Sequence, residues 1–154
     1  MRIAVFPGSF DPITIGHVDI VYKALPLFDK FIIAIGTNTQ KKSLFSLEQR
    51  EEWIREVFKN EPKIMVDHFD GLTAEYAHKI AAHHLVRGLR NGSDFDYEKT
   101  ISQVNKVLNA NLETIFFISS PEVAHISSTI VREIIVGGGD ASAFIPKDIK
   151  LNLK

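Results

Sequence analysis

The chain has 154 residues, enough for one domain with a substantial hydrophobic core and short for two. Its 18 basic and 19 acidic side chains give a formal net charge of −1, so no overall field attracts nucleic acid or an anionic membrane. It contains no cysteine, which excludes disulfides, thiolate catalysis and Cys-ligated zinc and is compatible with a reducing compartment.

The apolar stretches bear on localisation. The run Ile3–Phe6 is too short for the apolar region of a signal peptide, and no stretch approaches the ~20 apolar residues of a membrane-spanning helix. We expect a cytoplasmic protein that forms one domain over residues 1–154 and has neither nucleic acid nor membrane among its partners.

Strand-like and helix-like segments alternate along the chain. The expected strands are the apolar runs Ile3–Phe6, Phe31–Ile35, Ile64–Val66, Leu85–Val86 and Thr114–Ile118. Amphipathic stretches lie near residues 18–25, 47–58, 73–83, 95–108 and 129–136, and in the fourth we expect a core stripe at Tyr97, Ile101, Val104 and Leu108. The alternation predicts an α/β fold with a Rossmann-like, doubly wound, five-stranded parallel sheet and helices on both faces.

The loop after the first expected strand has the composition of a phosphate site. Residues 7–17 read Pro-Gly-Ser-Phe-Asp-Pro-Ile-Thr-Ile-Gly-His. Gly8 and Gly16 allow the backbone to approach an anion, and the helix expected to open at Gly16 and His17 directs free N–H groups and its positive dipole end toward that anion. The His17 ring, neutral or charged, can add a further N–H donor.

The other polar segments follow the remaining strands. In an open parallel sheet the ligand lies outside the carboxyl ends of the strands, where the strand order reverses. Lys41, residues 70–73, residues 87–90 and residues 119–129 each follow one of these strands. Geometry therefore gathers them with residues 7–17 at one edge of the sheet.

Residues 8–17 resemble the T-x-G-H form of the H-x-G-H element of a nucleotidyltransferase superfamily, with Thr14 in place of the first His. This form is found in the phosphopantetheine adenylyltransferases. Four more segments match that family in order: Lys41-Lys42 and residues 87–90, 94–98 and 126–133. The resemblance implies transfer of AMP from ATP to 4′-phosphopantetheine, which gives dephospho-coenzyme A and pyrophosphate in coenzyme A biosynthesis.

The resemblance also implies a role for individual residues. Those implied to act in catalysis are His17, Lys41, Arg90 and Ser128. Those implied to bind ATP are Ser9, Phe10, His17, Gly88, Leu89, Arg90, Glu98, Val123, Ala124, His125, Ile126, Ser127, Ser128 and Thr129. Those implied to bind the acceptor are Ser9, Lys41, Thr73 and Arg87.

Plainer structural explanations stay open for several of these residues. Ser9 could be only a turn residue, Phe10 part of the core, and Asp11 a residue that holds the loop. The arginines at 87 and 90 could form salt bridges with the carboxylates at 94, 96 or 98 instead of binding an anion. Ser127 and its neighbours precede an apolar helical run and should also cap that helix.

The sequence also bears on the metal cofactor, the oligomeric state and the alternative functions. His78, His83 and His84 are not spaced to stack on one helix face, so we expect no protein metal site and a Mg²⁺ ion carried by ATP. The resemblance implies a homohexamer with feedback inhibition by coenzyme A. The rivals are a cytidylyltransferase or nicotinamide-nucleotide adenylyltransferase, which Thr14 argues against, and a nucleotide sensor without turnover, which the retained His17 and Lys41 argue against.

Overall fold

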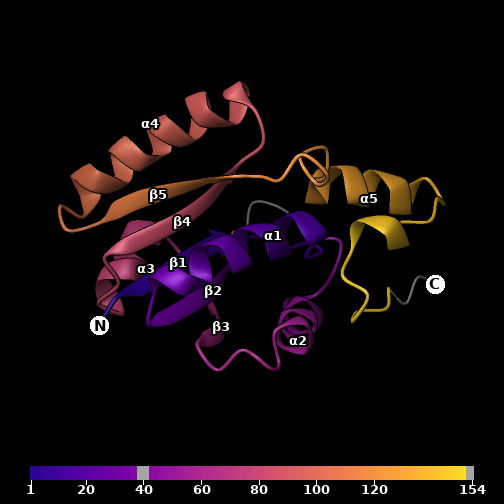
Figure 1. The fold of residues 1–154 in the computed structure, drawn as a ribbon, viewed down its shortest axis with the longest axis horizontal. Coiled ribbons are helices and arrows are strands. Elements are labelled where there is room, and N and C mark those ends of the chain that lie inside the picture. The colour runs from indigo at the N-terminus through magenta and orange to yellow at the C-terminus, as the bar shows by residue number, and fades with distance from the viewer. Residues whose placement is uncertain (38–41, 152–154) are drawn as a thin grey trace.

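A parallel sheet of five strands forms the centre of the protein. The computed structural model describes residues 1–37 and 42–151, and its strand order is β3-β2-β1-β4-β5, with every neighbouring pair parallel (Figure 1). The strands are β1 (Ile3–Gly8), β2 (Lys30–Gly36), β3 (Ile64–Phe69), β4 (His84–Leu89) and β5 (Glu113–Ile118). The predicted fold class is therefore confirmed.

The five predicted helices are all present. They are α1 (Ile15–Ala24), α2 (Leu47–Val57), α3 (Thr73–Lys79), α4 (Gly92–Leu108) and α5 (Ser128–Val136), with two 3₁₀ turns, η1 (Leu25–Leu27) and η2 (Ser142–Phe144). α1 begins one residue before the expected opening at Gly16, and α4 begins three residues before its predicted start, because Thr14 and Asn91 act as N-caps. In the described part of the chain, no helix combines the length and the apolar character needed to cross a bilayer.

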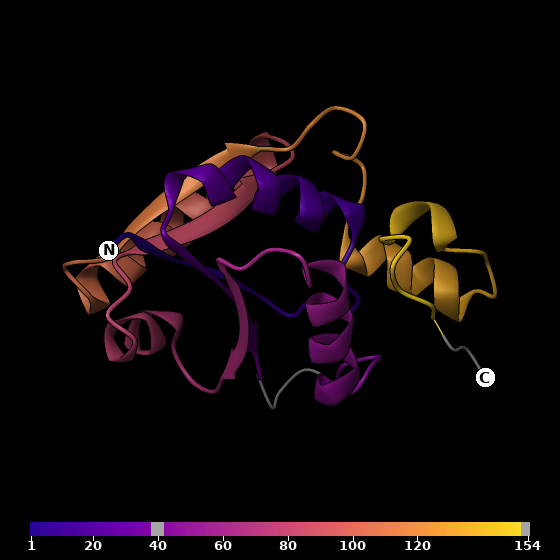
Figure 2. The same cartoon turned by 60° about the horizontal axis from the view of Figure 1, so that its bottom comes forward.

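Helices cover both faces of the sheet, each over its own apolar cluster. Alternate side chains of the central strands point to opposite faces, so Ala4 and Phe6 of β1 pack with α1, α2 and α5, whereas Val5 packs with α3. Figures 1 and 2 show α1 and α2 lying on the same face, with α5 beyond the carboxyl ends of the strands.

α4 is oriented opposite to the sequence prediction. Tyr97, Ile101, Val104 and Leu108, expected in the core, are all exposed. The side of α4 that faces the protein is polar, and its covered or half-covered residues are Asp94, Glu98, Ser102, Asn105 and Asn109 just beyond the helix. The helical spacing of a sequence shows that a helix has an apolar and a polar face, but not which face packs against the protein. In α4 the polar face is the inner one, because it borders a polar site.

β1 and β4 separate at their carboxyl ends. β1 pairs with β2 along its full length, but with β4 only at Ala4 and Val5. Beyond that point the Pro7 carbonyl accepts a hydrogen bond from the Arg87 side chain instead of the β4 backbone. Proline has no N–H to donate on that side, so the ladder stops there. The resulting opening lies where the strand order reverses, as expected for a ligand site in this class of sheet.

Candidate active site

Two cavities meet at the carboxyl edge of the sheet. The larger has a volume of about 420 Å³ and extends toward β2, β3 and α4, and the smaller, of about 280 Å³, extends toward α1 and α5. Both are lined by the same five residues, which form their junction: Pro7, Gly8, Ser9, Arg87 and Glu98. Two ligands bound in these cavities would therefore touch at the ends of β1 and β4.

His17 lines the smaller cavity, and hydrogen bonds to Thr14 determine which of its ring nitrogens carries the proton. The backbone N–H of Thr14 donates to Nδ1 of the His17 ring at 3.0 Å, and the backbone N–H of His17 lies 3.3 Å from the Thr14 hydroxyl oxygen that accepts it. This reciprocal pair is a capping box at the start of α1. Because Nδ1 accepts a hydrogen bond, the proton of the neutral ring is assigned to Nε2.

The surroundings of His17 keep its ring neutral. Its ring lies 4.8 Å from that of Phe10 and 6.1 Å from that of Phe6, measured between centroids. Burial, followed by the positive charges of Arg87 and Arg90, lowers the pKa of His17 to about 3. The sequence left the charge of this ring open, and the structure assigns a neutral ring at physiological pH that can donate from Nε2.

Arg87 joins the two strand ends at the cavity junction. Its Nε and Nη2 donate to the two carboxylate oxygens of Glu98 at 3.0 and 2.6 Å, and its Nη1 donates to the Pro7 carbonyl at 2.5 Å. A guanidinium has five N–H bonds, so two remain for an anion in either cavity. Arg87 therefore forms the salt bridge that was considered as an alternative, with Glu98, and it can still bind a phosphate.

Arg90 is also paired in the structure. Its Nε and Nη2 donate to Asp94 at 3.0 and 3.2 Å. Burial acts to raise the pKa of Asp94, but hydrogen bonds from the Arg90 side chain and backbone hold it below the ordinary value. The carboxylate is thus ionised, and it orients Arg90 along the wall of the smaller cavity.

The start of α5 forms another wall of the smaller cavity. Ser127 caps the helix by accepting a hydrogen bond from the Ile130 N–H at 3.2 Å, as predicted. The Ser128 hydroxyl donates to the Pro12 carbonyl at 2.8 Å, and the Thr129 hydroxyl accepts from Arg132. The N–H groups of the first helical turn have no acceptor within the helix, and together with the positive dipole end they favour a bound anion.

The structure brings most of the predicted site residues together. Those that line the smaller cavity are Ser9, His17, Gly88, Arg90, Glu98, Ile126, Ser127, Ser128 and Thr129. Those that line the larger cavity are Ser9, Thr73, Arg87 and Glu98. Lys41 lies outside the described residues.

Five of the residues predicted to bind ATP line neither cavity. Phe10 is buried between Phe6 and His17, and its φ of 46° is strained for a residue with a side chain, at a cost of about 1–3 kcal/mol. Leu89 is buried at the end of β4. Val123, Ala124 and His125 lie between β5 and α5, where the His125 ring approaches Phe144.

The sequence prediction missed several residues that line the cavities. Arg132 lies one helical turn after Thr129, a spacing that could have indicated a shared face of α5. Ser102 and Asn105 lie in the larger cavity one and two turns after Glu98. The polar repeat on α4 was a usable signal, but the apolar repeat on the same helix was interpreted as its inner face.

The carboxylates near the site already have partners. Glu98 and Asp94 bind arginines, and the Asp11 carboxylate accepts hydrogen bonds from the backbone N–H groups of Leu44 and Phe45. Over residues 1–37 and 42–151, no group of three His, Asp or Glu side chains is placed to hold a metal ion. This donor set fits a metal that enters with a phosphate ligand better than one held by the protein.

Comparisons with known proteins agree on one family. A family model described as Cytidylyltransferase-like matches residues 5–134. The phosphopantetheine adenylyltransferase of Flavobacterium psychrophilum is 48% identical over 151 residues, which cover 98% of this chain and 99% of that protein. The protein of the same name from Cytophaga hutchinsonii is 51% identical over 148 residues, covering 96% and 99%. That from Bacteroides thetaiotaomicron is 46% identical over 152 residues, covering 99% and 100%.

A solved structure with the same fold is more distant. It is a bifunctional NMN adenylyltransferase/ADP ribose pyrophosphatase from Francisella tularensis, complexed with AMP and a Mn ion. It aligns with a TM-score of 0.70 and 17% identity over 94% of this chain. This chain spans 44% of that longer one, and at such identity the likeness shows the fold alone.

Proposed function

Since this chain belongs to the phosphopantetheine adenylyltransferase family, we propose that it transfers AMP from ATP to 4′-phosphopantetheine, giving dephospho-coenzyme A and pyrophosphate. The observation that carries the proposal is the junction of the two cavities at Ser9, Arg87 and Glu98. The smaller cavity would hold the phosphates of ATP and the larger the pantetheine arm. The two reacting phosphates would then meet at the junction.

The reaction requires alignment of the two phosphates and neutralisation of their negative charge, and it does not require a general base. An oxygen of the acceptor's phosphate attacks the α-phosphorus of ATP, the bond from that phosphorus to the bridging oxygen breaks, and pyrophosphate leaves. Because the acceptor is already an anion at neutral pH, it needs no deprotonation. Neutral His17 would donate its Nε2–H to an α-phosphate oxygen, where charge develops in the transition state.

The ATP side of the proposal uses two helix starts and one arginine. The N–H groups at the starts of α1 and α5 and the side chain of Arg90 would bind the phosphates, with Ser128 holding the loop that faces them. Roles for Phe10, Leu89 and residues 123–125 rest on family resemblance alone. Mg²⁺ would arrive with ATP and be held by its phosphates, where it neutralises charge on the leaving pyrophosphate.

The acceptor side combines a cation with a partly apolar wall. The free N–H groups of Arg87 and the hydroxyls of Ser9 and Thr73 would bind the acceptor's phosphate or its amides, and Phe69 and Ile101 would contact the pantetheine chain. Lys41, placed by resemblance only, would add a second cation. Coenzyme A contains both an adenosine diphosphate and a pantetheine arm, so it would span both cavities and inhibit by competition.

The outer face of α4 supports self-association. Tyr97 is 67% exposed, Val104 50% and Leu108 52%, and these three form an apolar stripe along the helix, next to the larger cavity that Tyr97 and Ile101 line. We propose that a second copy of the chain covers this stripe in a homohexamer. A cytoplasmic location, expected from the cysteine-free sequence, remains a prediction.

Pyrophosphate release with a panel of acceptors tests the function. We expect release with MgATP and 4′-phosphopantetheine, and none above background with nicotinamide mononucleotide or phosphocholine. CTP should be a poor replacement for ATP, because a site that reads adenine through polar groups loses about 1–3 kcal/mol for each group left unpaired. If the protein bound ATP but released no pyrophosphate with any of the acceptors, it would instead be a nucleotide sensor.

A further inference from the structure

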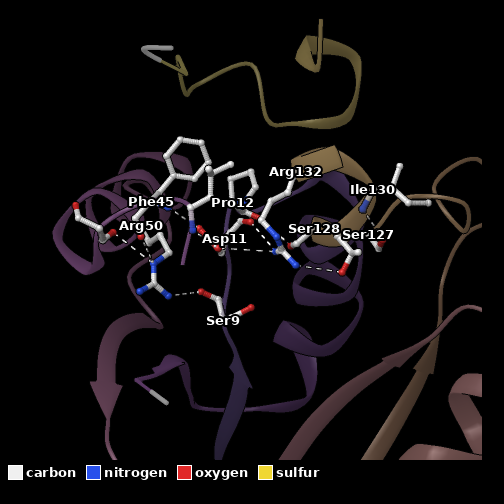
Figure 3. A network of polar contacts seen from close by, with 12 residues as sticks. Ser9, Asp11, Pro12, Phe45, Arg50, Ser127, Ser128, Ile130 and Arg132 are labelled. Atoms are coloured by element: carbon white, nitrogen blue, oxygen red, sulfur yellow. Dashed lines mark hydrogen bonds and ion pairs between the residues drawn. The ribbon is translucent and has the colours of Figure 1, made fainter. Parts of the chain in front are cut away.

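The loop between β1 and α1 is held by side chains that come from two other helices (Figure 3). The carbonyl of Ser9 accepts from Nη1 of Arg50 on α2, at 2.8 Å. The carbonyls of Asp11 and Pro12 accept from Arg132 and Ser128 on α5, each also at 2.8 Å. Three carbonyls of one short loop are therefore fixed from outside it, on either side of the strained residue Phe10.

Arg50 differs from the other two donors because it lies outside both cavities. Its side chain is buried, with the residue only 5% exposed, and its Nε also lies 3.2 and 3.4 Å from the carbonyl oxygens of Phe45 and Ser46. Among residues 1–37 and 42–151, no carboxylate forms an ion pair with it. Its bonds join the loop to the segment that leads into α2.

The carboxylate of Asp11 completes this connection from the opposite direction. It accepts hydrogen bonds from the backbone N–H groups of Leu44 and Phe45 at 2.8 and 2.9 Å, while Arg50 donates to the carbonyls of Phe45 and Ser9. The two chain segments are thus tied by one buried donor and one buried acceptor. Neither segment can shift without leaving a buried polar group unpaired.

Stability alone does not account for Arg50. A buried charge without a carboxylate partner is expensive, and an apolar side chain of similar volume would avoid that cost. What an apolar side chain could not do is hold the Ser9 carbonyl at a defined place. Ser9 is one of the five residues that line both cavities at their junction.

We infer that Arg50 is a positioning residue for the transfer reaction, which holds Ser9 at the junction between the two bound substrates without touching either one. The inference rests on the proposed adenylyl transfer. Because a misplacement of about 1 Å can cost about 10²-fold in rate, the loss of this contact should appear in kcat.

The test compares four proteins: wild type, Arg50→Gln, Arg50→Lys and the control Arg55→Gln. Arg55 lies on the same helix, exposed and paired with Glu51 at 3.1 Å, so its replacement removes one positive charge without touching the loop. For each protein we would measure the thermal unfolding midpoint, ATP affinity by calorimetry, and kcat and KM for 4′-phosphopantetheine, well below the midpoint.

For folded Arg50→Gln we expect kcat to fall by about tenfold or more with ATP affinity within about threefold, because His17 and Arg90 still line the smaller cavity. Arg50→Lys should lie between it and wild type, since an ammonium group cannot span the Ser9 and Phe45 carbonyls together. The Arg55→Gln control should match wild type.

A kcat of folded Arg50→Gln within twofold of wild type would overturn the inference, whatever happens to its melting temperature. If Arg50→Gln does not fold, Arg50→Lys decides: a loss of about threefold or more in kcat supports positioning, and a wild-type kcat contradicts it. A wild-type protein that releases no pyrophosphate would instead contradict the proposed function.

Discussion

Thr14 and His17 exchange hydrogen bonds at the start of α1: the Thr14 backbone N–H donates to Nδ1 of the His17 ring at 3.0 Å, and the His17 backbone N–H donates to the Thr14 hydroxyl oxygen at 3.3 Å. One contact caps the helix, and the other assigns the ring proton to Nε2. The capping box that begins α1 therefore also directs the proton of the His17 ring to Nε2, the donor proposed for catalysis.

This pairing suggests an informative substitution, His17→Gln. Glutamine suits the third helical position of a capping box, so it can preserve the helix start while removing the ring N–H. We expect kcat to fall by about 10²-fold or more, as for the loss of a donor to an oxyanion, with a melting temperature close to that of wild type. His83→Gln, at an exposed position far from the cavities, is the control. A kcat of His17→Gln within twofold of wild type would contradict the proposed role.

The low pKa of His17 predicts a pH dependence of stability. Its pKa is about 3 in the folded protein and near 6.5 when unfolded, so between these values the unfolded chain binds the extra proton. Protons therefore favour unfolding, and the stability that is fully present above pH 6.5 is lost as the pH falls toward 3. From pH 6.5 to 4.5, the free energy of unfolding of wild type should fall more steeply than that of His17→Gln. Equal slopes in urea titrations would refute the assigned neutral ring.

Arg87 should matter mainly for the acceptor. Because Arg87→Ala alone would strand the buried Glu98 carboxylate, the suitable variant is Arg87→Ala with Glu98→Gln. We expect KM for 4′-phosphopantetheine to rise by about tenfold or more while KM for ATP changes less, and Lys41→Ala should act in the same direction. Unphosphorylated pantetheine should be a poor acceptor for wild type. Equal use of pantetheine and its phosphate would disprove the binding of the acceptor's phosphate by Arg87.

Gly88 allows α1 to lie close to β4. A Cβ at this position would lie 2.7 Å from Cγ1 of Ile20, which is closer than real contacts allow. Because Ile20 lies in the middle of α1, Gly88→Ala should displace this helix, which carries His17, and lower both stability and kcat. Adding Ile20→Ala removes the atoms in conflict, and we expect it to recover part of the lost kcat despite its own cavity. Recovery of stability without any recovery of kcat would argue that the position of α1 does not control the reaction.

The apolar stripe of α4 predicts how assembly can be broken. Val104→Asp places a charge in the middle of the stripe, and we expect it to shift the sedimentation coefficient toward smaller species. Gln103→Asp, at an exposed position outside the stripe, is the control. An unchanged oligomer in Val104→Asp, or a monomeric wild type, would rule out this surface as the interface.

The sheet and the phosphate loop could be predicted because their signals are local. Apolar β-rich runs such as Phe31–Ile35 are typical of strands in a parallel sheet covered on both faces, and a parallel sheet gathers the following loops at one edge. Likewise, a Gly-His pair that begins a helix after a turn-rich loop is typical of a phosphate-binding site, as at Gly16 and His17. The predicted contacts of Lys41 and of residues 123–125 remain predictions.

The orientation of α4 and the role of Arg50 could not be obtained in this way. A helix with one polar and one apolar stripe looks the same in sequence whether the polar stripe faces solvent or a polar cavity. Arg50 follows Glu48 and Gln49 and precedes Glu51, a context typical of an exposed helix face, yet its partners are backbone carbonyls up to 41 residues away. Side chains that bind backbone carry no pairing signal in a single sequence.

The fate of the α-phosphorus of ATP distinguishes the proposed transfer from its alternatives. Wild-type protein with Mg²⁺, 4′-phosphopantetheine and ATP labelled at the α-phosphorus should move the label into dephospho-coenzyme A, with one pyrophosphate released for each labelled product. Label that appears in free AMP, or that enters a dinucleotide only when nicotinamide mononucleotide replaces the acceptor, would contradict transfer between these two cavities.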